Sequence, residues 1–248
     1  RLSGTFPLSP RLDTVGWFVS CAEDARLMLE LTSQEAAVPD SEPLPNAAAR
    51  QPAEGGIRLA AVIPPDVTLD SEAHHRWNEA LNSFHRAEGV SLEVVEAPPV
   101  LGSEAWNAYG VIGSVDAAAV HGDWLDRYQS LYDPLVWSLI DRGRRWSPAR
   151  LSTAEAVRED VTQAMHELLS TRDMLVMPVT PTASPTFERA DGSFREAVLR
   201  LNVPVSLAGL GALTVPLLHS ATRSSGMQLV IPPGGEQRLC ELITRLGW

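Results

Sequence analysis

The stretch IRLAAVI (residues 57–63), followed by a helical pattern over 71–88 and then by VSLEV (residues 90–94), decides the fold class of this chain. The first run is apolar and ends at a Pro-Pro pair, which predicts a buried strand. Apolar residues then recur at helical spacing until Gly89, where we expect the helix to stop. Alternation of apolar and polar residues predicts a second strand, parallel to the first. Residues 57–96 therefore indicate an α/β protein.

Other patterns extend this unit into a larger α/β body. The apolar run from Met174 to Val179 suits a strand covered on both faces. Two capping-box patterns, Ser20-Cys21-Ala22-Glu23 and Ser152-Thr153-Ala154-Glu155, predict helix starts. The remaining expected elements are strands at 212–218 and 227–231, helical pieces within 103–145 and a last helix at about 236–246.

We expect a single domain over residues 1–248, in three parts that differ in composition. Residues 1–32 form an N-terminal segment and a helix. Residues 33–56 are rich in proline and lack a sustained period, which predicts a surface linker. Residues 57–248 form the α/β body. The chain begins without an initiator Met or a signal-peptide pattern, so we expect its N-terminus to be a cut within a longer protein.

The charge balance excludes some classes of function. With 20 basic and 31 acidic residues, the net charge is −11, which argues against binding to nucleic acid or anionic membranes. No run approaches the roughly 18 apolar residues that span a bilayer. Cys21 and Cys240 lie far apart, so no disulfide is indicated and a cytoplasmic location is expected. All 20 basic residues are arginine, so a lysine base must come from elsewhere.

Several histidines suggest other chemistry that their surroundings disfavour. His74, His75 and His85 fall on one predicted helix, but their spacing is not that of an i, i+4 ligand pair, so we expect solvated residues and no metal site. His121-Gly122-Asp123 would suit a proton shuttle, and a helix end with a surface carboxylate is the alternative. The chain has no G-x-S-x-G elbow, so a self-contained Ser-His-Asp hydrolase is not indicated.

Four segments, in order, carry a resemblance to the amidase-signature family. They are GTFPLSPRLDTVG (4–16), DMLVMPVTP (173–181), LAGLGALTVP (207–216) and GMQLV (226–230). The family patterns that they resemble are G-x-x-P-L-x-x-S-L-D-T-V-G-P, D-x-L-x-x-P-x-x-P, N-L-x-G-x-P-A-x-x-x-P and G-x-Q-L-V. The first match is the most specific, and together the four span essentially the whole chain. Ser206 and Gly211 depart from the third pattern, which has Asn and Pro at those positions.

The resemblance implies the C-terminal part of the amidase-signature fold, with a mixed, mostly parallel sheet wrapped by helices. It also implies hydrolysis of a carboxamide to an acid plus ammonia or an amine, by a Ser nucleophile, a second Ser and a Lys, without a cofactor. In the family the nucleophile lies in a Gly/Ser-rich stretch that ends shortly before the position corresponding to Arg1. We therefore expect no catalytic residue in this chain, which would supply scaffold and a cavity wall to a missing N-terminal catalytic segment.

Chemistry supports this expectation, because a serine needs a base to remove its proton and a desolvated lysine can be that base. Without lysine the isolated chain should be inactive. The alternative is a non-enzymatic binding or assembly module that retains the amidase scaffold. The loss of half a sheet should uncover a strand edge and an apolar face, which favours self-association, such as a homo-oligomer, or aggregation.

Four residues are candidates for binding the amide substrate. Arg142, in a cluster with Arg144 and Arg145, would grip a substrate carboxylate with its guanidinium fork, and a solvated basic cluster is the alternative. By resemblance, Leu201, Asn202 and Val205 fall where relatives line the acyl-side channel. For those three the alternative is ordinary strand-and-turn packing.

Overall fold

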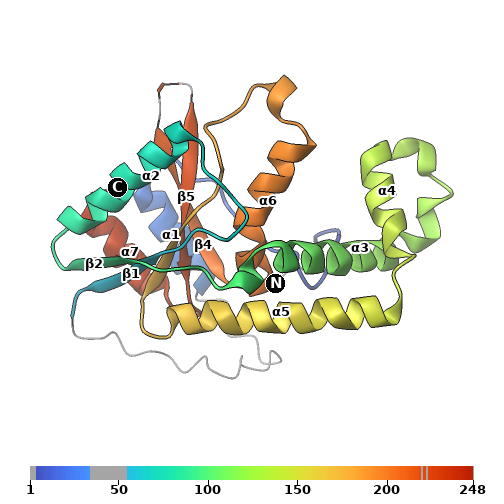
Figure 1. The fold of residues 1–248 in the computed structure, drawn as a ribbon, viewed down its shortest axis with the longest axis horizontal. Helices are drawn as coiled ribbons and strands as arrows, with labels where there is room; N and C mark the ends of the chain where they lie inside the picture. The colour runs from blue at the N-terminus through green and yellow to red at the C-terminus, as the bar shows by residue number, and fades with distance from the viewer. Residues whose placement is uncertain (1–3, 34–54, 219, 222, 248) are drawn as a thin grey trace.

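A five-stranded mixed sheet forms the centre of the computed structural model, which describes residues 4–33, 55–218, 220–221 and 223–247 (Figure 1). The strands are β1 (Ile57–Ala61), β2 (Val90–Val94), β3 (Met174–Pro178), β4 (Gly211–Leu218) and β5 (Ser224–Ile231), and they lie in the order β2-β1-β3-β5-β4. β1 pairs in parallel with β2 and β3, whereas β5 pairs antiparallel with β3 and β4. Four strands therefore share one direction, and the predicted mixed α/β fold is confirmed.

Helices cover both faces of this sheet. They are α1 (Ala22–Ser33), α2 (Ser71–Arg86), α3 (Ser103–Leu125), α4 (Pro134–Gly143), α5 (Pro148–Leu169), α6 (Gly192–Leu207) and α7 (Glu236–Leu246), with short 3-10 turns at Pro99–Leu101, Gln129–Leu131 and Phe187–Arg189. One apolar core joins α2 and α7 to the sheet, and a second core joins α3, α5 and α6 to the opposite face. Within the described ranges, no helix is both long and apolar enough to cross a membrane.

The predicted β-α-β unit is confirmed. β1 and β2 pair in parallel from Ile57 opposite Val90 to Ala61 opposite Val94, and α2 connects them. The Asp70 side chain caps this helix by accepting the Ala73 N–H at 2.7 Å. Most of the linker predicted over 33–56 lies outside the described residues.

Strand β3 is buried on both faces, as its sequence predicts. Met174 and Val176 belong to the core under α2 and α7, while Leu175 and Met177 belong to the core under α3, α5 and α6. All five of its residues are buried. Since β3 also hydrogen-bonds to strands on both sides, it joins the two halves of the domain.

The start predicted for α5 is wrong. The capping box at Ser152 lies inside the helix, which begins at Pro148 instead. The Ser147 hydroxyl accepts the Arg150 N–H at 3.1 Å, and proline takes the first helical position, where its missing N–H has no cost. A serine followed by proline was therefore the stronger start signal.

Helix α6 was not predicted from the sequence. Strand-and-turn packing was the alternative for residues 201–205, and the structure shows that they lie in this helix instead. The Asp191 carboxylate caps it by accepting the N–H groups of Ser193 and Phe194. Pro204 stands within the last turn and masked the helical pattern.

Helix α4 crosses α3 at a point where the two backbones touch. A Cβ atom added to Gly143 would overlap the carbonyl oxygen of Ser114. The Ser114 hydroxyl also accepts a hydrogen bond from the Trp146 indole at 3.0 Å, just beyond α4. Glycine at 143 therefore permits the crossing that holds α4 against the far end of α3 (Figure 1).

We expect Gly143→Ala to lower the free energy of unfolding by about 3 kcal/mol, because the new methyl group collides with backbone and not with a movable side chain. Gly122→Ala in α3 is the matched control, since its Cβ would meet nothing within 4 Å. That control should be neutral or stabilising by up to about 1 kcal/mol. Urea denaturation measures both, and a tolerated alanine at 143 would contradict the close crossing.

Candidate functional site

Residues 4–21, here called the strap, lead from the N-terminal end of the described chain to α1. The strap contains a tight turn in which the Ser9 carbonyl accepts the N–H groups of Leu12 at 2.8 Å and Asp13 at 2.7 Å. The Asp13 carboxylate accepts the N–H of Leu8 at 2.9 Å and of Ser9 at 3.0 Å. Leu12 and Asp13, the L-D pair of the first family pattern, thus stabilise the turn through hydrogen bonds to Leu8 and Ser9.

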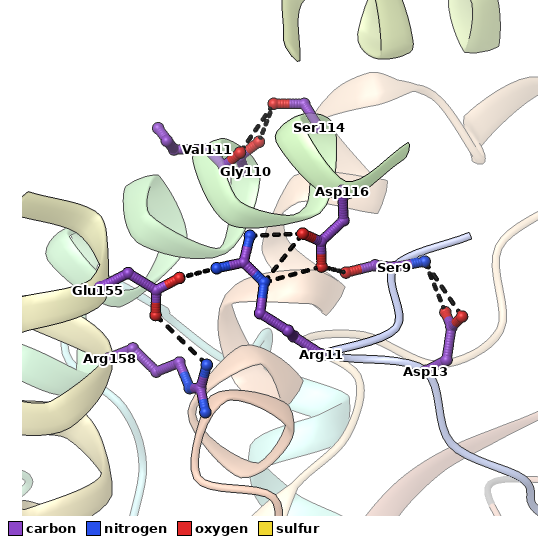
Figure 2. Close-up of polar contacts among 9 residues, drawn as sticks. All are labelled: Ser9, Arg11, Asp13, Gly110, Val111, Ser114, Asp116, Glu155 and Arg158. Atoms are coloured by element: carbon purple, nitrogen blue, oxygen red, sulfur yellow. Dashed lines mark hydrogen bonds and ion pairs between the residues drawn. The ribbon is translucent and has the colours of Figure 1, made fainter. Parts of the chain in front are cut away.

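Charged side chains fasten this turn to α3 and α5. Figure 2 shows Arg11 between Asp116 of α3 and Glu155 of α5, with its Nε donating to Asp116 Oδ1 at 2.9 Å. The Ser9 hydroxyl donates to the second oxygen of Asp116 at 2.7 Å. Glu155 also pairs with Arg158 at 3.3 Å. We call this group the clasp.

The clasp controls the ionisation of Asp116. Burial of the Asp116 side chain, which is 11% exposed, raises the pKa of its carboxyl. Hydrogen bonds from Arg11 and Ser9, together with the Arg11 charge, outweigh burial, so the pKa of Asp116 lies below its usual range. The same hydrogen bond to Asp116 raises the pKa of Arg11. Both groups are therefore charged at neutral pH.

Apolar contacts complete the attachment of the strap. Leu12 packs against the core shared by α3, α5 and α6. Its side chain lies over Gly113 of α3, where an added Cβ atom would be 3.7 Å from Leu12 Cδ1. Phe6 meets the rings of His121 and Trp124 near the end of α3, with centroids 5.6 and 5.4 Å apart. His121 also lies 2.7 Å from the Tyr132 hydroxyl, which places it in an aromatic cluster.

Asn202 lies where β3 ends and connects three elements. Its Nδ2 group donates to the carbonyls of Val179 at 3.0 Å and Val198 at 2.6 Å. Its Oδ1 accepts from Nε2 of the buried Gln228 on β5 at 3.3 Å. Both amide hydrogens are therefore in use, and the free hydrogen-bonding capacity of Asn202 lies on its oxygen.

Of the other three predicted substrate residues, Leu201 and Val205 lie beside Asn202 on α6, whereas Arg142 lies on α4. Leu201 and Val205 are buried, with 0% and 6% of their surfaces exposed. Their side chains therefore pack in the protein interior and help to hold α6 in place. Arg142 is exposed on the last turn of α4. Its guanidinium lies close to α3 at Gly110, where an added Cβ atom would be 4.0 Å from Nη2 of Arg142. Whether any of the four touches a substrate stays a prediction.

Arg142 differs from its neighbours in its pairing. Arg144 pairs with Asp126 at 2.7 Å, and Arg145 pairs with Asp141 at 2.9 Å. For Arg142, the described part of the chain shows no ion pair. Arg144 and Arg145 therefore form ion pairs at the end of α4. The guanidinium of Arg142 remains available to bind an anion.

The remaining candidates are a metal site, the histidines of α2 and a surface groove, and among the described residues none of them forms a catalytic or metal-binding arrangement. The described residues contain no group of three or more His, Cys, Asp or Glu side chains placed to hold a metal ion. His75 lies 3.4 Å from Glu79 on the exposed face of α2, as expected of a solvated residue. A shallow groove runs between α2 and β4, lined by Ala80, Val215 and Leu217 among others, and it contains none of the predicted substrate residues.

The clasp is hard to predict from local sequence patterns. Asp13 belongs to a recognised pattern, but Arg11 stands where that pattern has Ser, and its partners lie more than one hundred residues further along the chain. Only the fold brings Asp116 and Glu155 to the strap.

Comparison with known proteins gives a consistent result. The model of the family named Amidase matches residues 2–240. Outer envelope protein 64 of Arabidopsis thaliana chloroplasts is 23% identical over 97% of this chain and 43% of its own length. A putative amidase, AmiD, of Mycobacterium bovis is 26% identical over 54% of this chain and 29% of its own length.

Solved structures agree on the fold. An amidase crystal structure matches with a TM-score of 0.77 and 23% identity, over 97% of this chain and 54% of its own. Kluyveromyces lactis allophanate hydrolase matches with a TM-score of 0.78 and 23% identity, over 98% of this chain and 40% of its own. The chain thus spans about half the length of these relatives, or less.

Replacement of Arg11 by Met should lower the free energy of unfolding by about 1–2 kcal/mol at neutral pH, because it leaves Asp116 and Glu155 without their shared donor. Arg26→Met is the matched control. It removes an exposed i, i+4 pair with Glu30 on α1 and should cost about 0.5 kcal/mol or less.

The effect of Arg11→Met should depend on pH in a defined direction. Because the pKa of Asp116 is lowered in the folded protein, the stabilisation is complete above its unfolded pKa of about 3.9 and disappears as the pH falls through the lower folded value. Urea titrations at about pH 7, 5 and 2.5 measure this. A difference between variant and wild type that persists undiminished in acid would exclude Asp116 as the partner that matters.

Proposed function

The chain belongs to the amidase family, and from that premise we propose that it is part of an enzyme that hydrolyses a carboxamide C–N bond. In this proposal the 248 residues supply scaffold and one wall of the substrate cavity, while a catalytic segment supplies the nucleophile. The substrate is a small amide, and no cofactor takes part. The observation that carries the proposal is a family match over nearly the whole chain combined with a complete lack of lysine.

The clasp contains a Ser-carboxylate pair that is unsuited to nucleophilic catalysis. Ser9 donates to Asp116, but a general base works best with a pKa near the working pH, whereas the pKa of Asp116 is lowered. Asp116 also accepts from Arg11, so its oxygens are committed to the strap. This supports a structural role for the pair, and in the proposal the base that removes the serine proton lies outside these residues.

The carboxyl end of β3 is the position that we assign to the cavity wall. Ligands of open α/β sheets bind beyond the carboxyl ends of the strands. Val179 and Thr180 follow β3 at that end, with Asn202 fixed beside them. The Thr180 hydroxyl is buried there, and the described residues offer it no hydrogen-bond partner. A polar group from a substrate or from the catalytic segment would satisfy it.

The location proposed for this enzyme is the cytoplasm. The proposal rests on the cysteine usage: Cys21 and Cys240 lie far apart in the sequence and indicate no disulfide framework. Homo-oligomer formation is a further proposal.

A second candidate function is a non-enzymatic binding or assembly module. It is favoured by the relative that matches 97% of this chain, which is named as an envelope protein and not as an amidase. The coding sequence upstream of Arg1 distinguishes the two. A lysine and a G-G-S-S-G-G-S type stretch there support the amidase, and a start codon alone supports the module.

Complementation tests the proposed activity. The purified 248-residue chain is mixed with the catalytic segment encoded upstream and assayed for ammonia or amine release from a panel of linear amides. The proposal expects turnover from the mixture and from neither part alone. Release of product by the chain alone, or by no combination of the parts with any amide, would contradict it.

Arg142→Gln should raise the KM of the complemented enzyme for amides that carry a free carboxylate by roughly tenfold, the value of one charge-assisted hydrogen bond. Amides without a carboxylate should be unaffected. Arg145→Gln is the matched control, since Arg145 is already paired with Asp141. Equal losses with both kinds of amide, or with both variants, would show that Arg142 does not recognise the carboxylate.

A further inference from the structure

The strap runs antiparallel along one side of α3. Three contacts hold it there, and in each the strap residue number rises as the α3 residue number falls: Phe6 on His121, Ser9 on Asp116 and Leu12 over Gly113. These contacts are of three different kinds, an aromatic pair, a hydrogen bond and an apolar contact. The direction in which the strap crosses the helix is therefore fixed at several points along its length.

The turn in the strap adjusts its length to that of the helix. Residues 113–121 of α3 span about 12 Å, because an α-helix rises 1.5 Å for each residue. Residues 6–12 of the strap would span up to about 20 Å if they were fully extended. The turn closed by the Asp13 carboxylate, which accepts the N–H groups of Leu8 and Ser9, shortens the path. The turn and the contacts with α3 thus depend on each other.

Arg11 extends the attachment from α3 to α5. Its guanidinium lies between Asp116 and Glu155, as Figure 2 shows, and its side chain is 34% exposed. Charge-assisted hydrogen bonds of this kind are roughly twice as strong as neutral ones. The family pattern has Ser at this position, and a serine side chain is too short to bridge two helices. The double attachment is therefore a feature that this chain adds to the pattern.

A strap fastened to two helices fixes the place where the chain enters it. Gly4, the first described residue, is two positions from Phe6, which lies near the end of α3. Any segment that precedes Gly4 starts from that place. Catalysis is sensitive to such placement, because an error of about 1 Å in the position of a reacting group can lower a rate about 100-fold.

We propose that Arg11 is a positioning residue for the nucleophile of the complete enzyme: it fastens the strap to α3 and α5 and so fixes where the catalytic segment enters. This inference rests on the proposed function, which places that segment before the strap. Arg11 contacts no substrate and exchanges no proton with one. It acts through the strap, and Asp116 and Glu155 are its means of attachment.

Hydrogen exchange tests the attachment without any substrate. In the polypeptide made from the complete gene, Arg11→Met should make the strap amides of Leu8, Ser9 and Asp13 exchange at least about tenfold faster. The amide of Ala73, which Asp70 caps on α2, should exchange at an unchanged rate. Equal exchange of the strap amides in variant and wild type would overturn the inference, whatever the activity of the enzyme.

Kinetics of the complete enzyme separate positioning from a merely structural role. Well below the unfolding transition, Arg11→Met should lower kcat by about 10- to 100-fold and change KM for a linear amide by less than about twofold. Arg11→Lys keeps a charge that reaches one of the two carboxylates, so it should recover part of the lost kcat. Arg26→Met, which removes an exposed pair on α1, is the matched control and should leave both constants unchanged.

Three kinetic results would overturn the inference. They are an unchanged kcat, a rise in KM at constant kcat, and a fall in kcat no larger than the fall in the folded fraction. Any of them in an active amidase removes the inference and leaves the proposed function.

A complete polypeptide that cleaves no amide would instead remove the proposed function. The rate of labelling by a fluorophosphonate then tests the inference, because the probe reacts with an activated serine of any serine hydrolase. Slower labelling of Arg11→Met than of wild type would support positioning. Equal rates, or no labelling of either protein, would overturn it.

Discussion

Strand β3 is buried on both of its faces, and the rest of the structure depends on that burial. Each face contributes to a different core, one under α2 and α7 and the other under α3, α5 and α6. At about 2 kcal/mol for each apolar side chain, the strand contributes on the order of 10 kcal/mol, comparable with the whole net stability of a domain. The same strand fixes the position of Val179 and Thr180, and through Val179 it fixes Asn202 on α6. The proposed cavity wall is thus a consequence of how β3 is packed.

The elements that could be predicted from the sequence are those whose signal is local. The alternation in β2, the apolar run of β3 and the helical period of α7 each lie within one short window, and the structure confirms them. The start of α5 was misplaced because two capping signals compete there and the proline after Ser147 decides between them. α6 was missed because Pro204 interrupts a pattern that tertiary packing nevertheless holds helical.

The candidate site was less predictable because it is built from contacts that are distant in sequence. Asn202 was singled out by resemblance, but its bonds to Val179 and Gln228 required the fold. Arg11 was not singled out at all, since its partners Asp116 and Glu155 belong to two different helices. The Arg11 contacts join parts of the chain that precede and follow the predicted linker, and the Asn202 contacts join α6 to the end of β3 and to β5. Local sequence patterns carry no information about such distant contacts. What the sequence does establish is chemical: its basic residues are all arginine, whose side chain stays protonated and cannot serve as a base.

The central claim is that these residues form an amidase scaffold with no activated serine. A fluorophosphonate, which reacts with activated serines, followed by intact-mass measurement of the purified 248-residue chain, tests this claim most directly. The claim predicts the mass of the unmodified chain. One covalent adduct per chain, located on a single serine, would contradict it.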